Sequence, residues 1–235
     1  MLETISDEIW SVPSPLRFGG LSVGTRMTII RRADGELVLV SPVPISAGLV
    51  ASIESLGKVG AIIVPNLLHH LYAGDWLSKL PDARSYGPPG IAKKRPDLAL
   101  DREIGPDFDD AEGPDIVCFP IGGMPALAES LFLHRPSSTL IATDFCFFMP
   151  EATGLTALFA SVTGIKKKVK CEPLFRMMIK DTAAFRSSLL PLRALEIQHL
   201  SMCHHSVRSM GATEALQAVL DQLSVPSNQS VDRVD

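Results

Sequence analysis

Side chains that can bind a metal ion follow three apolar runs of the sequence. They are His69 and His70 after residues 61–64, Asp144 after residues 140–143, and His204 and His205 after residues 195–202. Short runs rich in branched residues are typical of buried strands, and ligands of layered α/β domains bind outside strand ends. Imidazole and carboxylate groups together suit zinc, iron or manganese. Their repeated placement at strand ends therefore favours a metal site, although a histidine taken singly is more often a hydrogen-bonded structural residue.

Asp144 and Cys203, the neighbour of His204, each have an alternative interpretation. Asp144 directly follows an apolar run, where a carboxylate is costly unless it is paired, hydrogen-bonded or bound to metal. Cys203 could act as a nucleophile beside His204, but it is better explained as a small apolar residue that ends a strand.

Composition restricts the class of protein. The 235 residues are 46 % hydrophobic and 20 % charged, with a formal net charge of −4, which excludes a disordered chain and does not favour nucleic-acid binding. The acidic start has no features of a secretory signal, and no apolar run approaches the roughly 20 residues that span a bilayer. The four cysteines are widely spaced and indicate reduced thiols. We therefore expect a cytoplasmic protein that acts on a small-molecule ligand, with neither a nucleic-acid nor a membrane partner.

The first part of the chain alternates strand signals with turn signals. Strands are expected over 8–12, 16–23, 25–32 and 36–41, with a hairpin turn at Asp34-Gly35 and a second turn candidate at Gly19-Gly20. Ser46 can begin a helix that carries Leu49 and Ile53, the strand 61–64 follows, and another helix carries Trp76. This change from a meander to strand–helix alternation predicts a sheet covered by helices.

Residues 86–114 are rich in proline and acidic residues, which predicts a lid-like loop or an insertion with a solvated acidic face. Strands are then expected over 116–120, 130–134, 139–143 and 195–202. Between the last two lies the lysine run of residues 166–170, expected to be a solvated face. Asp181 can begin a helix, and Leu216, Val219, Leu220 and Leu223 form one apolar helix face. We expect one domain over residues 1–223 and a disordered polar tail over 224–235.

In the order of its elements the chain resembles the metallo-β-lactamase fold, and more closely the DUF4336 family, an uncharacterised branch of that superfamily. Several short motifs carry this resemblance, and it extends to about Leu223. They are Phe18-Gly-Gly-Leu, Gly24-Thr-Arg-Met, Ser41-Pro42, Pro65-Asn66 with His69-His70, Lys94-Arg95-Pro96-Asp97, Glu129 with His134-Arg135-Pro136-Ser137, Asp144, and Pro173-Leu-Phe-Arg176. The resemblance implies a four-layer αββα sandwich, an α/β fold with its site at one edge of two sheets.

The chain departs from the superfamily's His-x-His-x-Asp-His signature. Asn66 and Leu68 stand where two histidines are expected, and the residues 122–124 lack the middle histidine. The resemblance implies that Asp144 is the bridging aspartate and His204 the last histidine. His70, Asp144 and His204, with His69 as a further option, would then hold one metal ion with an open position for water.

Two functional hypotheses follow. The first is a metal-dependent hydrolase of an ester, lactone, thioester or phosphodiester, with His69 or His205 as the acid–base residue. The second is a non-catalytic binding or scaffold protein without a metal ion, in which His69, Asp144 and His204 only hydrogen-bond one another.

Overall fold

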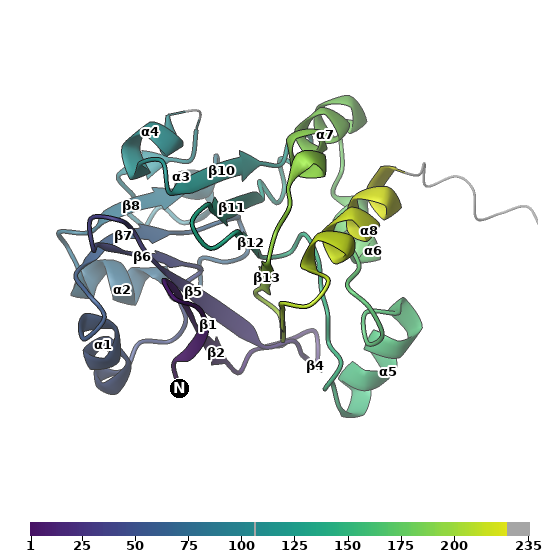
Figure 1. Ribbon diagram of the computed structural model, residues 1–235, viewed down its shortest axis with the longest axis horizontal. Coiled ribbons are helices and arrows are strands. Elements are labelled where there is room, and N and C mark those ends of the chain that lie inside the picture. Colours follow the sequence, from purple (N-terminus) through teal and green to yellow (C-terminus); the bar gives the residue numbers. More distant parts are fainter. Residues whose placement is uncertain (106, 225–235) are drawn as a thin grey trace, which may run out of the picture.

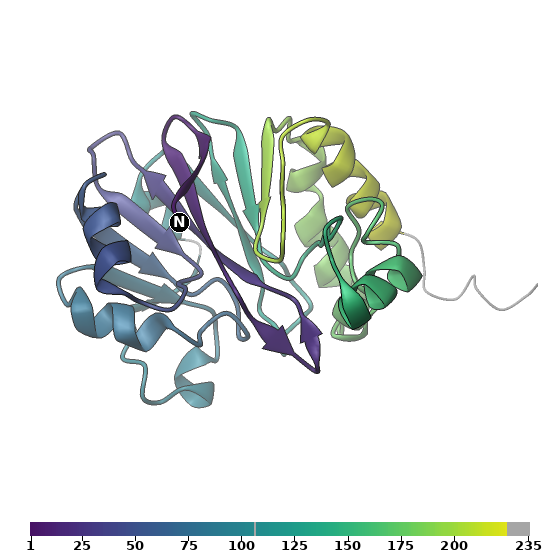
Figure 2. The ribbon, with the colours of Figure 1, turned by 90° about the horizontal axis from the view of Figure 1, so that it is seen from below.

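Two β-sheets face each other at the centre of the molecule, and helices cover the outer face of each (Figure 1 and Figure 2). The structure is a computed structural model that describes residues 1–105 and 107–224, without the side chains of residues 110 and 111. The first sheet has the order β1-β2-β5-β6-β7-β8-β9 and the second β10-β11-β12-β13-β14, and β3 and β4 pair as a separate hairpin.

The strands of the first sheet are β1 (Glu3–Ser6), β2 (Ile9–Ser14), β5 (Thr25–Arg31), β6 (Leu37–Val40), β7 (Val59–Ile63), β8 (Arg84–Gly87) and β9 (Arg102–Glu103). Those of the second are β10 (Ile116–Pro120), β11 (Ser130–His134), β12 (Thr139–Ala142), β13 (His199–Met202) and β14 (Val207–Arg208), and the hairpin is β3 (Arg17–Phe18) with β4 (Leu21–Ser22). The helices are α1 (Ala47–Glu54), α2 (Ala73–Lys79), α3 (Ile91–Lys94), α4 (Phe108–Glu112), α5 (Gly154–Thr163), α6 (Pro173–Met177), α7 (Thr182–Leu189), a 3₁₀ turn over Pro191–Ala194, and α8 (Ala212–Ser224). None of these helices is long and apolar enough to cross a bilayer.

The layers follow from the alternation of side chains along the strands. In β5, Met27 and Ile29 pack with α1 and α2, whereas Ile30 packs between the sheets with Phe132 and Ile141. The outer face of the second sheet packs against α6, α7 and α8. Each sheet thus buries both faces, and this four-layer order confirms the αββα sandwich expected from the sequence.

The local signals that proved correct are those with a specific hydrogen-bonding function. Asp34-Gly35 joins β5 to β6. Ser46 Oγ accepts the Leu49 N–H at the start of α1, and Asp181 Oδ1 accepts two N–H groups at the start of α7. Each of these residues satisfies backbone groups that would otherwise lack partners at an element's end.

Two expectations for the first half were wrong. The single strand expected over 16–23 is the β3–β4 hairpin, because Gly19 and Gly20 both adopt positive φ and turn the chain. Residues 86–114 are not a lid-like loop, because β9 pairs with β8 and Glu112 of α4 bonds to Arg32, Arg84 and Tyr86. The tail expected over 224–235 lies outside the described residues, except Ser224, which ends α8.

The topology brings three strand ends to one edge. β12 and β13 are parallel neighbours, so the residues that follow them, Asp144 and His204, emerge side by side. β7 belongs to the other sheet, and the backbone N–H of Ser130 donates to Pro65 just beyond it at 3.0 Å. The ends of strands from both sheets therefore meet between the layers.

Candidate functional site

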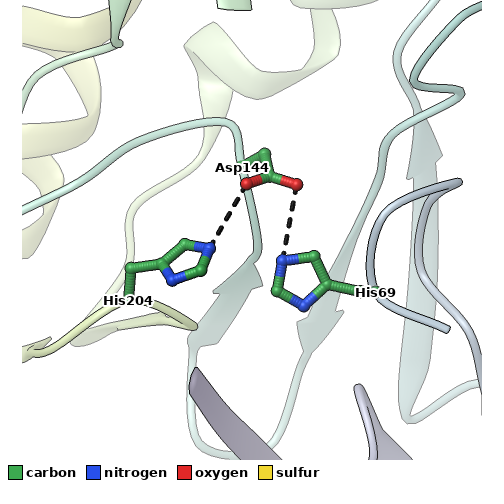
Figure 3. A group of neighbouring side chains, drawn as sticks. All are labelled: His69, Asp144 and His204. Atoms are coloured by element: carbon green, nitrogen blue, oxygen red, sulfur yellow. Dashed lines mark ion pairs between the residues drawn. The ribbon is translucent and has the colours of Figure 1, made fainter. Parts of the chain in front are cut away.

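His69, Asp144 and His204 converge at this edge (Figure 3). His69 Nε2 lies 3.4 Å from Asp144 Oδ2, and His204 Nε2 lies 3.3 Å from Asp144 Oδ1. One possible ligand atom from each residue lies within 4.8 Å of the others. The side chains are 7 %, 14 % and 7 % exposed, so the carboxylate is the most accessible of the three. We call these residues the HDH cluster.

The backbone around Gly24 fixes the ring of His204. His204 Nδ1 lies 2.8 Å from the carbonyl oxygen of Gly24, which can only accept, so this nitrogen carries a proton and donates it. Phe147 stacks on the same ring, with centroids 5.1 Å apart and planes 9° apart. In the neutral imidazole, the Nε2 that faces Asp144 is therefore a lone-pair donor.

Ser41 and Cys203 hold the ring of His69 from its other side. His69 Nδ1 lies 2.8 Å from Ser41 Oγ and 3.4 Å from Cys203 Sγ, which leaves Nε2 directed at Asp144. Cys203 is 3 % exposed, and its thiol donates to the Arg26 carbonyl at 2.8 Å. Cys203 is thus a buried member of a polar network between the sheets and not an accessible nucleophile.

Asn66 links His69 to Asp144. Its Oδ1 accepts the backbone N–H groups of Leu68 and His69 at 2.7 and 2.8 Å, which sets the direction of the chain after β7. Its Nδ2 donates to Asp144 Oδ2 at 2.8 Å and to Glu129 Oε2. Because both ends of the fully buried amide have partners, Asn66 positions the cluster and has no free ligand atom.

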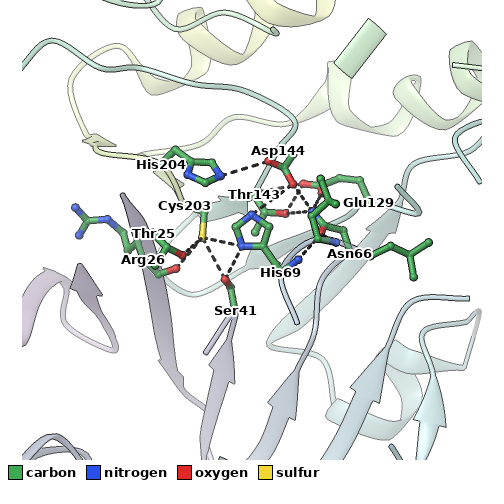
Figure 4. A network of polar contacts seen from close by, with 12 residues as sticks. Thr25, Arg26, Ser41, Asn66, His69, Glu129, Thr143, Asp144, Cys203 and His204 are labelled. Carbon is green, nitrogen blue, oxygen red and sulfur yellow. Dashed lines mark hydrogen bonds and ion pairs between the residues drawn. The ribbon is translucent and has the colours of Figure 1, made fainter. Parts of the chain in front are cut away.

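Glu129 lies beside Asn66 in the polar network and accepts a hydrogen bond from it (Figure 4). It is 1 % exposed, and its Oε1 accepts the backbone N–H of Thr143 at 3.0 Å and the Thr143 hydroxyl at 2.6 Å. Burial raises the pKa of Glu129 to about 7, and the charge of Asp144 adds to the rise. Glu129 was named above only among the motif residues of the resemblance and not as a site residue; the signal for a site role was a carboxylate just before an apolar strand.

The charges of the HDH cluster depend on one another. Burial alone would raise the pKa of Asp144, but His69 and His204 hold it well below its usual range. Burial would lower the pKa of both histidines, but Cys203 and Asp144 raise that of His69 and Asp144 raises that of His204. The charge of each imidazole is therefore coupled to that of Asp144, and a cation bound between them would compete with the imidazole protons.

The structure separates the paired histidines of the sequence. His70 turns away from the cluster, and its Nδ1 lies 2.8 Å from Arg95 Nη1. Burial lowers the pKa of His70, and Lys94 and Arg95 lower it further. His69 occupies the position beside Asp144 and His204 that the sequence analysis gave to His70, because the turn set by Asn66 Oδ1 directs residue 69 inward.

His205 lies outside the HDH cluster. It has a φ of 71°, and its Nε2 lies 2.9 Å from the carbonyl oxygen of Ser22. It lines a cavity of about 300 Å³ that also borders Pro13, Pro15, Gly24 and Arg26. Gly24, whose carbonyl oxygen accepts the hydrogen bond of His204, also lines this cavity.

Replacing Glu129 with Gln is expected to lower the free energy of unfolding by about 1–3 kcal/mol, because an NH₂ group would face the Asn66 or Thr143 donors and leave a buried group unsatisfied. Chemical denaturation of both variants and the wild type at the same pH would measure this loss, with the exposed Glu151→Gln as the matched control. Equal unfolding free energies for the two variants would contradict the supporting role of Glu129.

Comparisons with known proteins give a structural likeness only. No model of a known protein family matches the chain, so the resemblance to DUF4336 gains no support there, and no curated protein matches it in sequence. The structure is similar to solved metallo-β-lactamases. DIM-1 metallo-β-lactamase exposed to ceftazidime is 15 % identical in sequence, and the match covers 95 % of this chain and 97 % of that one with a TM-score of 0.64. The metallo-β-lactamase from Pontibacter korlensis is 13 % identical, with 95 % and 98 % of the two chains covered and a TM-score of 0.64. FIM-1 from Pseudomonas aeruginosa in its mono-zinc form is 12 % identical, with 96 % of each chain covered and a TM-score of 0.62. At such identities the likeness establishes the metallo-β-lactamase fold.

Proposed function

We propose, from the metallo-β-lactamase fold and the HDH cluster at its sheet edge, that this protein is a hydrolase dependent on one divalent metal ion. His69 Nε2, His204 Nε2 and an oxygen of Asp144 would hold the ion. The observation that carries the proposal is the convergence of two imidazoles and one carboxylate whose other polar atoms already have protein partners. Such partners fix the tautomer and orientation of metal ligands.

The donor set fits a metal ion. Because the Nδ1 proton of His204 is committed to Gly24, its neutral ring places a lone pair against a carboxylate oxygen at 3.3 Å. Two acceptors at that distance repel each other unless a proton or a cation lies between them. Two imidazole nitrogens and a carboxylate oxygen form a common set for zinc, and iron or manganese would also accept it.

A metal ion at the HDH cluster would lower the pKa of a bound water and so provide a hydroxide at neutral pH. The chain's own residues have separate tasks. Asn66 and Glu129 hold Asp144 in place, and Phe147 keeps the His204 ring at a fixed angle. With His69 assigned to the metal, His205 is the remaining acid–base candidate, because it borders the cavity next to His204. The substrate class proposed is an ester, lactone, thioester or phosphodiester.

We further propose that the site holds a single ion. The HDH cluster is the one group of three or more potential His, Cys, Asp or Glu ligands that converge within residues 1–105 and 107–224. Leu68, at an expected ligand position, offers no donor atom, and both ends of the Asn66 amide are hydrogen-bonded. A cytoplasmic location belongs to the same proposal, since the four cysteines are unpaired thiols.

The metal content of untagged protein, purified without chelators, tests this proposal directly. Elemental analysis is expected to give one divalent ion per chain, and dialysis against a chelator should remove both the ion and the hydrolysis of generic ester and phosphodiester substrates. Two ions per chain would contradict the mononuclear site.

A non-catalytic binding or scaffold protein is the second candidate. The observation that favours it is that Asp144 lies 3.4 and 3.3 Å from the two imidazoles, so the three side chains can satisfy one another as a closed hydrogen-bond network. A preparation without metal, together with no uptake of added zinc, iron or manganese, would reject the hydrolase and favour this candidate.

A further inference from the structure

Helix α5 presents apolar side chains to solvent. Leu155, Leu158 and Val162 are 71 %, 63 % and 81 % exposed, and their i, i+3, i+7 spacing places them on one face. The opposite face of α5 is buried through Thr156 and Ala160. The usual pattern of a surface helix, apolar inside and polar outside, is therefore absent, and contiguous exposed apolar residues indicate an interaction surface.

A turn of lysines follows this face directly. Gly164 ends α5 with a φ of +82°, and the Lys166 N–H donates back to the Ala160 carbonyl at 3.0 Å. Lys167 and Lys168 are exposed, and neither side chain bonds to any group in the described part of the chain. The backbone bonds thus hold two free ammonium groups beside the last turn of α5, in a protein whose formal net charge is −4.

We propose that α5 and the turn Lys166–Lys168 dock on the surface of an anionic phospholipid bilayer. Leu155, Leu158 and Val162 would enter the boundary between headgroups and acyl chains, and the lysines would contact lipid phosphates and carboxylates. Charge complementarity selects an anionic surface as the occupant, because the exposed Lys167 and Lys168, whose side chains have no partner in the described part of the chain, adjoin the apolar face of α5. This contact lies on the surface and needs no spanning helix. It does not depend on the proposed hydrolase.

The apolar residues to be varied lie on the outer face of α5, opposite its buried residues Thr156 and Ala160. α5 projects from one corner of the molecule, far from α1 and α2 on the outer face of the first sheet (Figure 1 and Figure 2). Because the replaced side chains are exposed and outside the core, the test can use the full folded chain.

Co-sedimentation of the full-length protein with vesicles tests the proposal. Vesicles of phosphatidylcholine mixed with phosphatidylserine should bind the protein, and vesicles of phosphatidylcholine alone should bind it much less. Lys167→Gln combined with Lys168→Gln should weaken binding to the anionic vesicles roughly 30-fold, at about fivefold per lysine. Leu158→Ser combined with Val162→Ser should also weaken it.

Matched controls lie elsewhere on the surface. Lys58→Gln combined with Lys79→Gln removes two exposed charges beside α1 and α2, and Met210→Ser removes an apolar side chain that is 86 % exposed. Both control variants should bind like the wild type. The proposal is overturned if the wild type does not bind anionic vesicles, if the α5 and control variants lose binding equally, or if the protein is a dimer that Leu158→Ser dissociates while vesicle binding persists.

Discussion

Replacing Asp144 with Asn is expected to abolish metal binding and hydrolysis while the fold is retained. Asp144 faces both imidazoles of the HDH cluster, at 3.4 and 3.3 Å, and contributes its only negative charge. The amide keeps the shape of the side chain but removes the charge that offsets the cation. Changes to residues that merely support a ligand cost roughly 10–100-fold in metal affinity, so loss of a ligand should exceed this. Metal uptake by calorimetry, with circular dichroism to verify folding, would measure the change.

The same variant separates the two candidate functions. In a purely structural network, the amide introduced by Asp144→Asn would place an NH₂ group against Asn66 Nδ2 or a protonated imidazole, and a buried unsatisfied group costs about 1–3 kcal/mol. A wild type free of metal, together with a clear fall in the melting temperature of Asp144→Asn, would therefore reject the metal site. Metal bound by the wild type and lost in the variant would support it.

His69→Asn and His70→Asn are expected to differ strongly although the two residues are adjacent. The first removes an imidazole that lies 3.4 Å from Asp144, so metal binding should fall by more than about 100-fold. The second removes only the contact with Arg95, so one ion per chain should remain. Equilibrium titration of the metal-free proteins with zinc would measure both affinities.

This pair of variants also tests which histidine the chain uses. Each variant is the control for the other, since both make the same chemical change at adjacent positions. Retained metal in His69→Asn and lost metal in His70→Asn would assign the site to His70, as the sequence analysis expected, and would contradict the orientation given by Asn66.

Much of the fold could be predicted because its signals are local. Ser46, Asp34-Gly35 and Asp181 act within two or three residues of themselves, and short apolar runs identify buried strands wherever they pair. The error over residues 86–114 came from long-range partners. Residues 86–114 have the composition of a loop, but Glu112 is buried by Arg32 and Arg84, which are distant in sequence.

The candidate site could be predicted only in part for a related reason. Asp144 and His204 follow strands directly, so their meeting depends on strand order alone. Which of His69 and His70 points into the cluster depends on the turn of the backbone after β7. The Asn66 side chain sets that turn, because its Oδ1 accepts the backbone N–H groups of Leu68 and His69. Glu129 was overlooked because its importance arises from Asn66 and Thr143, which meet it only in the folded protein.

The assembly of the HDH cluster from both sheets has a consequence for folding kinetics. Asn66 and Asp144 are 78 residues apart in sequence, and Gly24 and His204 are 180 apart. Contacts of such separation form slowly, because a long loop must close before they contribute free energy. The cluster is therefore among the last parts to assemble, after the sheets have docked. A ligand that binds there would slow unfolding and leave the folding rate nearly unchanged, since its contacts are absent from the transition state.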